Sequence, residues 1–178
     1  QPFYLRTGLP IVSRVLEILL ARGANPQESG LRGIQLGGSV MPSAALARIQ
    51  EAFAADTIGI YGMTEIGGAF VAIETQPCSG IYRFARRHYM LQELLPSAQH
   101  PGLHEVVLTM LGREGTQLVR YGTQDLVRVK PDGQSFDVAG RFDDELIFGH
   151  MNFIWNTEVE LAISRRLGSS HFSVVLER

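Results

Sequence analysis

The sequence predicts an α/β fold in which a β-α-β unit is followed by a small antiparallel β-barrel-like subdomain and by the start of an α+β domain. Three observations predict it: two short apolar runs around a helix-like segment, a later series of short alternating strands, and a final segment with helix-capping signals. Two apolar strands joined by a helix favour parallel pairing. The 178 residues, 45% of them hydrophobic, suffice for one domain with part of a second.

The first part of the chain alternates helix and strand signals. In PIVSRVLEILLARG (10–23) apolar residues recur at helical spacing, between a proline that suits a first turn and a glycine that suits an end. GIQLGG (33–38) and TIGIY (57–61) are typical of buried strands, and PSAALARIQEAF (42–53) predicts the helix between them. Ligands bind at the carboxyl ends of such parallel strands, where glycine-rich stretches of this chain lie.

Short strands dominate the next part. Alternating patterns predict strands in AFVAIE, HEVVLTML, TQLVRYG, DLVRVK and SFDVAG, over 69–74, 104–111, 116–122, 125–130 and 135–140. KPDGQ (130–134) predicts a turn, and the whole series fits an antiparallel sheet or a small barrel. After a charge cluster at 141–144, NTEVELAISRRLG (156–168) predicts a helix with capping-box spacing, and HFSVVLE (171–177) predicts a last strand.

Composition limits what the chain binds. Its formal net charge is -2, and the sequence contains no long run of charges of one sign. Both observations argue against nucleic acid or a membrane surface as a partner. No stretch approaches the roughly 20 apolar residues of a membrane span, and no signal peptide is visible. Cys78 is the single cysteine, so we expect a reducing compartment, the cytoplasm. The chain begins at Gln1 and ends directly after a strand-like run, so we expect a fragment of a longer protein.

The stretch YGMTEIGG (61–68) places glycines, a hydroxyl and a carboxylate directly after a predicted strand. Glycine-rich turns expose backbone N–H groups to phosphate oxygens, and Thr64 adds a hydroxyl donor. Glu65 would repel a bare phosphate but suits a magnesium ion that bridges phosphates, and Tyr61 offers a flat face to a base. The same residues also fit a tight turn with a capping threonine and a solvated glutamate, so the motif alone leaves both interpretations open.

Four ordered segments resemble the adenylate-forming superfamily of acyl-CoA synthetases, and most of all its phenylacetate-CoA ligase-like branch. They are IQLGGSVMPSAALARIQEAF, IGIYGMTEIGG, GLHEVVLTMLGREGTQLVRYGTQDLV and AGRFDDELIFGHMNFIWNTEVE, and together they run from about residue 33 to residue 160. The resemblance implies that 1–140 is the C-terminal part of a large AMP-binding domain, with the β-α-β unit in 1–75 and the barrel-like subdomain in 76–140. It implies that 141–178 holds the hinge and the beginning of the small C-terminal domain.

The resemblance also implies a nucleotide site in the first two of these segments. The glycine turn after the first strand would lie against adenine through Gly37, Gly38 and Ser39. The YGMTE segment would place Tyr61 on adenine, Gly62 and Met63 along the nucleotide, Thr64 on phosphate and Glu65 on Mg²⁺. Val40, Met41 and residues 67–69 would line part of the acid pocket.

The later segments would supply the ribose contact and the hinge. Asp125 is in register with the aspartate that accepts hydrogen bonds from the ribose hydroxyls, while Gln124 stands where much of the superfamily has glycine. Arg141 would reach the ribose or phosphate as a fixed cation, and Asp143 would be the pivot of the small domain. Taken alone, Asp125 also fits a turn residue, and GRFDD fits a charged linker.

The implied activity is that of an adenylate-forming ligase. A carboxylic acid, expected to be aromatic, would react with ATP to give an acyl-adenylate, and CoA or another acceptor would then take the acyl group. The cofactors implied are ATP/AMP, Mg²⁺ and CoA. The partners implied are a small-molecule carboxylate and a nucleotide, without nucleic acid or membrane, and a homodimer is left open.

Two family features are absent from this sequence. Relatives carry a hydroxyl-rich phosphate loop upstream of the Gly-Gly segment and a catalytic lysine in the small domain, whereas Lys130 is the only lysine here and lies in a strand-turn context. The fragment alone is therefore expected to be inactive. The alternative is a non-catalytic relative that binds or sequesters an aromatic carboxylate or a nucleotide.

Other clusters favour ordinary structural roles. His100 and His104 flank a Pro-Gly pair, and no HExxH or CxxC spacing occurs, so zinc is not expected. Cys78 lies in a loop context without a recognisable activating neighbour. YRFARRHYM (82–90) interleaves arginines with aromatics, which we interpret as a strand or loop near an anionic ligand.

Overall fold

The computed structural model describes the following residues of the chain. They are 3–38, 41, 43–66, 70–85, 90–111, 115, 117–142, 145–148, 152–155, 159, 162, 163 and 166. Ser39, Val40, residues 67–69 and Asp143 lie outside them, as do the predicted last strand and most of the predicted helix over 156–168.

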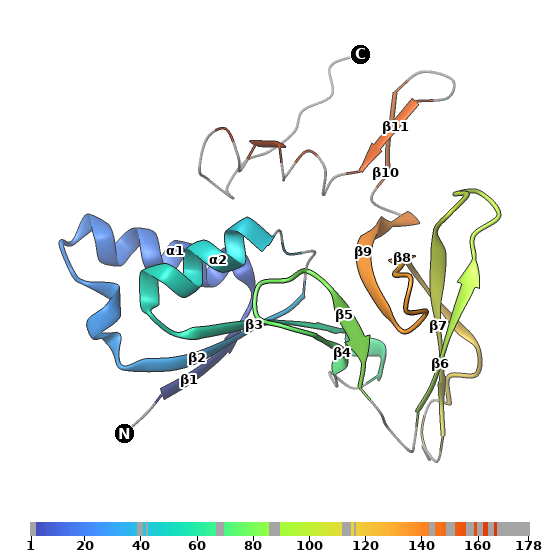
Figure 1. Ribbon diagram of the computed structural model, residues 1–178, viewed down its shortest axis with the longest axis horizontal. Coiled ribbons are helices and arrows are strands. Elements are labelled where there is room, and N and C mark those ends of the chain that lie inside the picture. Colours follow the sequence, from blue (N-terminus) through green and yellow to red (C-terminus); the bar gives the residue numbers. More distant parts are fainter. Residues whose placement is uncertain are drawn as a thin grey trace.

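The first part of the chain forms parallel strands covered by helices. Its elements are β1 (Phe3–Thr7), α1 (Leu9–Ala21), the 3-10 turn η1 (Pro26–Ser29), β2 (Leu31–Leu36), α2 (Ser43–Phe53) and β3 (Asp56–Gly62). β2 pairs in parallel with β1 on one side and with β3 on the other. The helices α1 and α2 lie on the same side of these strands (Figure 1). The predicted β-α-β unit over β2, α2 and β3 is thereby confirmed.

Apolar periodicity explains why the helices cover that side. Val12 and Leu16 of α1 are buried at helical spacing, as are Leu46, Ile49 and Phe53 of α2. They pack with strand residues such as Ile34 and Leu36 into one core. At the end of α1, Gly23 adopts a φ of +68, a left-handed conformation that ends a helix readily. The sequence therefore predicts this layer almost to its ends.

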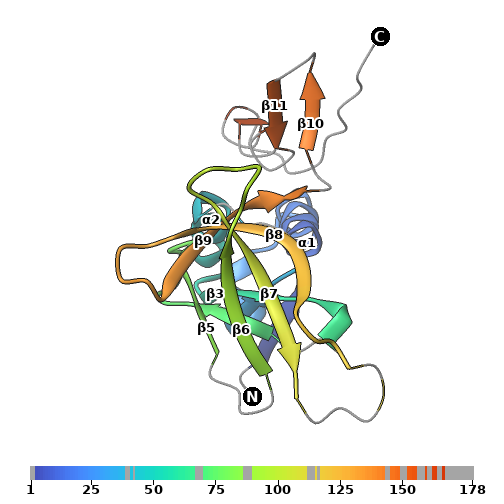
Figure 2. The same cartoon turned by 90° about the vertical axis from the view of Figure 1, so that its right-hand side faces the viewer.

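The second part of the chain continues the same sheet with antiparallel strands. These are β4 (Phe70–Glu74), β5 (Tyr82–Phe84), β6 (Met90–Pro96), β7 (His104–Met110), β8 (Tyr121–Val129) and β9 (Ser135–Arg141). The nine strands follow the order β1-β2-β3-β4-β5-β9-β8-β7-β6, so β1 and β6 are the two edges of the pairing. Figure 2 shows β6 to β9 side by side. The strands are antiparallel as predicted, whereas the barrel-like subdomain and the domain limits stay predictions.

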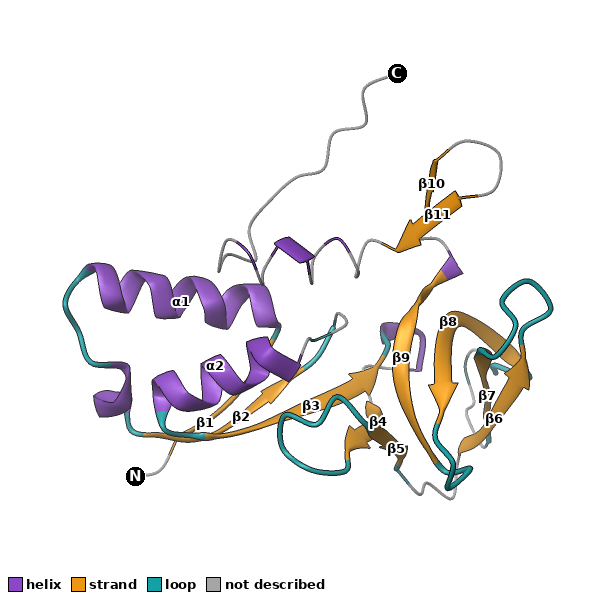
Figure 3. Cartoon of the chain, turned by 45° about the horizontal axis from the view of Figure 1, so that its top comes forward, coloured by secondary structure: helices purple, strands orange, loops and turns teal. Residues whose placement is uncertain are grey.

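A second core lies under the antiparallel strands. It joins Val71 of β4, Val106 and Leu108 of β7, Val127 of β8 and Phe136 of β9, all of them fully buried. β3 pairs in parallel with β2 and antiparallel with β4, so it joins the two parts (Figure 3). This position places the end of β3 between the two cores.

The structure corrects the predicted strand pattern in one place. Residues 116–122 and 125–130 do not form two strands, because β8 is a single strand that starts at Tyr121. Glu105 of β7 pairs with Leu126 and Val107 pairs with Gly122, so Thr123, Gln124 and Asp125 together lie opposite Val106 alone. This bulge resembles a turn in the sequence, but the strand continues through it. The sequence analysis also missed β1 and β6, and it interpreted 82–90, which contains β5, as either a strand or a loop.

The remaining elements are short. η2 (Thr64–Ile66) is a 3-10 turn that follows β3, and β10 (Glu145–Phe148) pairs antiparallel with β11 (Asn152–Trp155). None of the helices in the described part of the chain combines the length and apolarity that a membrane crossing requires.

Candidate functional site

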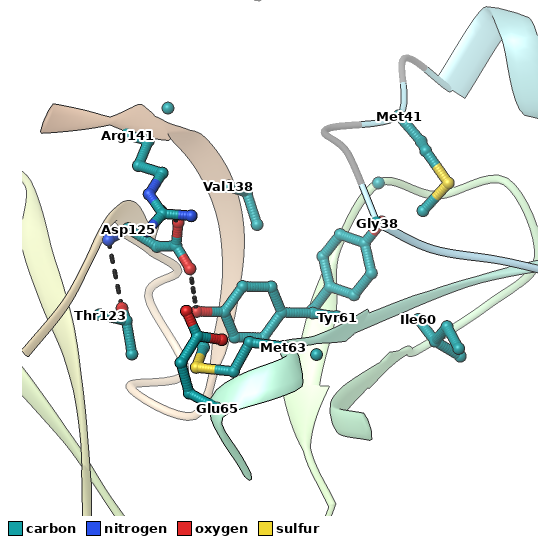
Figure 4. A pocket seen from close by; sticks show the side chains of 14 residues that line it. Gly38, Met41, Ile60, Tyr61, Met63, Glu65, Thr123, Asp125, Val138 and Arg141 are labelled. Atoms are coloured by element: carbon teal, nitrogen blue, oxygen red, sulfur yellow. Dashed lines mark hydrogen bonds and ion pairs between the residues drawn. The ribbon is translucent and has the colours of Figure 1, made fainter. Parts of the chain in front are cut away.

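Two adjoining pockets open where β2 and β3 end and where the bulge of β8 faces β9. The inner pocket has a volume of about 190 Å³ and contains Tyr61, Tyr82, Thr123 and Asp125. The outer pocket has a volume of about 570 Å³. Both are lined by Gly38, Ile60, Gly62, Met63, Glu65 and Arg141. Because they share these residues, we treat them as one groove, whose inner part is drawn in Figure 4.

The Gly-Gly turn after β2 brings backbone to the wall of the groove. The N–H of Gly37 donates to the carbonyl of Thr7 at 3.1 Å. A Cβ on Gly37 would lie 2.9 Å from Cγ1 of Ile60 and 3.1 Å from its carbonyl oxygen. Gly38 has a φ of +91, in a region that other residues rarely adopt. Glycine is therefore needed at both positions.

Tyr61 crosses the inner pocket from the end of β3. Its ring packs edge-on against Phe136, with centroids 6.1 Å apart and an interplanar angle of 86°. Its hydroxyl donates to Oδ2 of Asp125 at 2.6 Å (Figure 4). Burial, followed by the negative charge of Asp125, raises the pKa of Tyr61 well above the ordinary phenol value. Tyr61 is therefore a protonated hydrogen-bond donor at neutral pH.

The bulge of β8 presents Asp125 to the inner pocket through a set of local bonds. Thr123 is buried, and its hydroxyl donates to the carbonyl of Val106 at 2.9 Å while accepting the N–H of Asp125 at 3.1 Å. Gln124 has a φ of +63, and its N–H donates to Oε1 of Glu105 at 3.1 Å. Gln124 thus holds a conformation that glycine adopts at least cost.

Arg141 completes this corner of the groove. It pairs with Asp125 across the β8–β9 ladder, and its Nε lies 3.9 Å from Oδ1 of Asp125. The Nε is buried and has no hydrogen-bond partner among the described residues. The Arg141 side chain as a whole is 42% exposed, so another part of it can meet a ligand oxygen in the groove.

Thr64 and Glu65 lie on η2, at the border of the two pockets. The Thr64 hydroxyl donates to Oε2 of Glu65 at 3.2 Å. Within the described residues, no three His, Cys, Asp or Glu side chains group closely enough to hold a metal ion by themselves. Mg²⁺ is typically held by one or two carboxylates together with substrate phosphates, so the single carboxylate of Glu65 fits this ion when a phosphate is present.

The groove brings together every predicted site residue that the structure describes. The inner pocket contains Gly38, Tyr61, Gly62, Met63, Glu65, Asp125 and Arg141, and the outer pocket adds Gly37 and Thr64. Met41, expected in the acid pocket, lines the inner pocket. Ser39 and Asp143 lie outside the described residues. The roles assigned to these residues stay predictions, whereas their convergence in space is a finding.

The sequence analysis missed several lining residues. They are Arg6, Thr7, Ile60, Gly80, Tyr82, Thr123, Val138 and Gly140. Arg6 and Thr7 end a strand that was not predicted, and Gly80 belongs to a loop without a recognisable motif. The parallel pairing of β1 with β2 is the signal that would have located the first two.

A buried carboxylate supports the loop that carries Gly80. Glu74 is 3% exposed, and its two oxygens accept the N–H groups of Gly59 at 2.6 Å and of Gly80 at 2.7 Å. Burial and the charge of Glu74 raise the pKa of the adjacent Tyr82 above the ordinary phenol value. Glu74 therefore ties β3 to the loop at the floor of the inner pocket.

Comparison with known proteins gives relatives of one kind. No family model matches the chain. A phenylacetate-coenzyme A ligase of Pseudomonas putida is 28% identical over 151 residues, which are 78% of this chain and 34% of that protein. The chain thus spans about a third of the length of this relative.

Among the solved structures of the same fold, we describe two examples that hold nucleotide-type ligands. A 2-hydroxyisobutyryl-CoA ligase in its postadenylation state, in complex with 2-HIB-AMP, matches with a TM-score of 0.74 and 19% identity over 93% of this chain and 38% of that one. The O-succinylbenzoate coenzyme A synthetase of Bacillus subtilis, in complex with ATP and magnesium ion, matches with a TM-score of 0.61 and 18% identity, over 90% of this chain and 36% of that one.

Proposed function

The chain is a homologue of the phenylacetate-coenzyme A ligases with the fold of the adenylate-forming CoA ligases, and we propose that it forms the nucleotide-holding part of an ATP-dependent acid–CoA ligase. The observation that carries this proposal is the convergence of Tyr61, Asp125 and Arg141 in one pocket. A phenol, a carboxylate and a guanidinium there offer the donors and acceptors that a nucleoside phosphate needs.

The proposed reaction has two steps. A carboxylate oxygen of the acid attacks the α-phosphorus of ATP, the acyl-oxygen-to-phosphorus bond forms, and the bond from the α-phosphorus to the bridging oxygen breaks, releasing pyrophosphate. The thiol of CoA then attacks the acyl carbonyl and AMP leaves. By analogy with the phenylacetate ligase relative, the acid is proposed to be aromatic and the acceptor to be CoA.

The residues of the inner pocket hold the nucleoside in this proposal. Asp125 accepts hydrogen bonds from the two ribose hydroxyls, which suits a carboxylate because each of its oxygens accepts. Arg141, whose side chain is 42% exposed, offers its guanidinium to a ribose or phosphate oxygen. The face of the Tyr61 ring lies against the base while its hydroxyl keeps the bond to Asp125.

The outer pocket receives the phosphates. Thr64 donates its hydroxyl to a phosphate oxygen, and the glycine backbone at 37, 38 and 62 leaves room for the chain to approach. Glu65 would hold Mg²⁺, which when bound offsets phosphate charge. The small domain would turn about Asp143 between the two steps.

One observation favours a second candidate, a non-catalytic relative that binds or sequesters an aromatic carboxylate or a nucleotide. The only lysine of this sequence, Lys130, pairs with Asp137 and lines neither pocket, so it supplies no positive charge to the groove. Such a protein would bind ligands as the ligase does but would not release pyrophosphate.

Calorimetric titration of the longest natural polypeptide that contains this chain tests the proposal. We expect binding of ATP with Mg²⁺, weakened about ten-fold or more by Asp125→Asn because a carboxylate acceptor is lost. Glu65→Gln should weaken binding of ATP with Mg²⁺ but leave metal-free AMP unchanged. Asp137→Asn, on β9 but outside both pockets, is the matched control.

Pyrophosphate release then separates the two candidates. Release that depends on phenylacetate, and that exceeds release with an aliphatic acid of similar size, supports the ligase. Binding without release supports the non-catalytic relative. A folded polypeptide that binds neither ATP nor AMP would refute the ligase, and one that also fails to bind phenylacetate would refute both candidates.

A further inference from the structure

An arginine outside the family motifs, Arg6, lines the outer part of the groove. Arg6 lines the outer pocket but not the inner one, whereas Asp125 lines the inner pocket but not the outer one. Arg141 and Glu65 line both, so they border both pockets. A ligand whose sugar rests on Asp125 would extend past Arg141 toward Arg6.

Strand register fixes the position of Arg6. In the parallel pair of β1 and β2, Arg6 is the partner of Gln35 and Thr7 is the partner of Leu36. The Thr7 carbonyl then accepts the N–H of Gly37, which ties the end of β1 to the Gly-Gly turn. Arg6 is therefore held beside the turn by backbone pairing.

Arg6 is an exposed residue of β1 that adds a second arginine to the outer pocket. The charged residues that line it are Arg6, Arg141 and Glu65. Arg141 faces Asp125 at 3.9 Å, and Glu65 lies beside Thr64 on η2. Arg6 is thus the second guanidinium of a pocket with glycine walls. Its planar fork of donors matches the oxygens of a phosphate or a carboxylate.

We propose that Arg6 forms an oxyanion-binding subsite at the outer end of the groove. The subsite rests on the proposed function for the identity of its ligand, which is either the pyrophosphate end of the nucleotide or a carboxylate of the acid. Both present two coplanar or adjacent oxygens to the same guanidinium. An Arg6 contact to either would position the reactants from the side opposite the ribose.

Titration of the longest natural polypeptide with three separate probes tests the subsite. The probes are inorganic pyrophosphate, phenylacetate and AMP, and the variants are Arg6→Gln and Arg6→Lys. Arg32→Gln is the matched control, because Arg32 is an exposed arginine on the neighbouring strand and lines neither pocket. Equal melting temperatures of the variants confirm that each is folded.

We expect Arg6→Gln to weaken the binding of either pyrophosphate or phenylacetate about ten-fold or more, while the affinity for AMP stays within about two-fold of the wild-type value. Arg6→Lys should restore part of the affinity, because it keeps the charge but loses the fork. Weaker pyrophosphate binding identifies the nucleotide tail as the source of the oxyanion, and weaker phenylacetate binding identifies the acid.

The two proposals fail in different ways. If the wild-type protein binds neither AMP nor ATP, the nucleotide site is refuted. An affinity for pyrophosphate that depends on Arg6 would still establish the subsite. Pyrophosphate and phenylacetate affinities that are equal in the wild type and in Arg6→Gln, or undetectable in both, would overturn the subsite.

Discussion

The hydroxyl of Tyr61 donates a 2.6 Å hydrogen bond to Asp125, which lies 64 positions later in the sequence. The bond joins the end of β3, which belongs to the parallel strands, to the bulge of β8 in the antiparallel strands. Asp125 also faces the guanidinium of Arg141 at 3.9 Å. The carboxylate is therefore held by a neutral donor on one side and a cation on the other.

We predict that Tyr61→Phe lowers the free energy of unfolding by about 1.5 to 3 kcal/mol, because a hydrogen bond to a charged acceptor is lost in a partly buried place. Urea denaturation measures this loss. The matched control is Tyr4→Phe, since Tyr4 is 78% exposed and its change should be small. Equal losses in the two variants would show that the bond adds nothing to stability.

We also predict that two tyrosines keep their phenolic protons in alkaline solution for as long as the protein stays folded. Burial and nearby carboxylates raise the pKa of Tyr61 and Tyr82, so the native state keeps protons that the unfolded chain releases above about pH 10. The free energy of unfolding is then unaffected below that pH and falls by about 1.4 kcal/mol per pH unit and per group above it.

Phenolate absorbance during alkaline titration checks this prediction. A first phase should come from exposed tyrosines, and a later phase should coincide with unfolding. Tyr61→Phe and Tyr82→Phe should each reduce the later phase. A single reversible phase near pH 10, with the fold intact, would contradict the raised pKa values.

Much of the groove could be predicted because its residues follow strands of clear pattern. The apolar runs that become β2 and β3 indicate parallel pairing, and parallel strands place the residues at their carboxyl ends, such as Gly38 and Thr64, at one edge of the sheet. Asp125 and Arg141 are predicted only by the family resemblance, because local sequence patterns do not indicate which distant segment of the chain faces the end of β3.

What could not be predicted depends on tertiary pairing. The bulge at 123–125 needs Glu105 and Val106 of the neighbouring strand to bind its backbone, so its sequence alone resembles a turn. Arg6 lies in a short edge strand with two exposed aromatic residues, a pattern without a buried face. Only the register with β2 places it at the groove.

We predict that Glu74→Gln destabilises the protein by about 2 to 3 kcal/mol. Glu74 is 3% exposed and accepts two backbone N–H groups, from Gly59 and Gly80, whereas a glutamine would turn its own N–H₂ toward one of these donors. Thermal and urea unfolding measure the change. Glu51→Gln is the control, because Glu51 is an exposed residue of α2. A loss as small as that of the control would exclude a structural role for the buried carboxylate.

The last prediction concerns the conformation that presents Asp125. Gln124 has a φ of +63, which costs a residue with a Cβ about 1 to 2 kcal/mol and costs glycine almost nothing on steric grounds. Gln124→Gly should therefore raise the free energy of unfolding by up to about 1 kcal/mol, after the larger entropy of unfolded glycine is subtracted. Gln124→Val should lower it by more than about 1 kcal/mol, because branching at Cβ fits a positive φ poorly.

Urea denaturation of both variants gives the sign of the change in the free energy of unfolding. Ala47→Gly, at an exposed position of α2, is the contrasting variant. It should lower the free energy of unfolding by about 1 kcal/mol, because glycine is unfavourable at an ordinary helical φ. Because Gln124→Gly keeps the N–H that donates to Glu105, Asp125 should stay in place and nucleotide affinity should change less than about two-fold. Destabilisation by Gln124→Gly would mean that the glutamine side chain stabilises the bulge by more than its backbone strain costs.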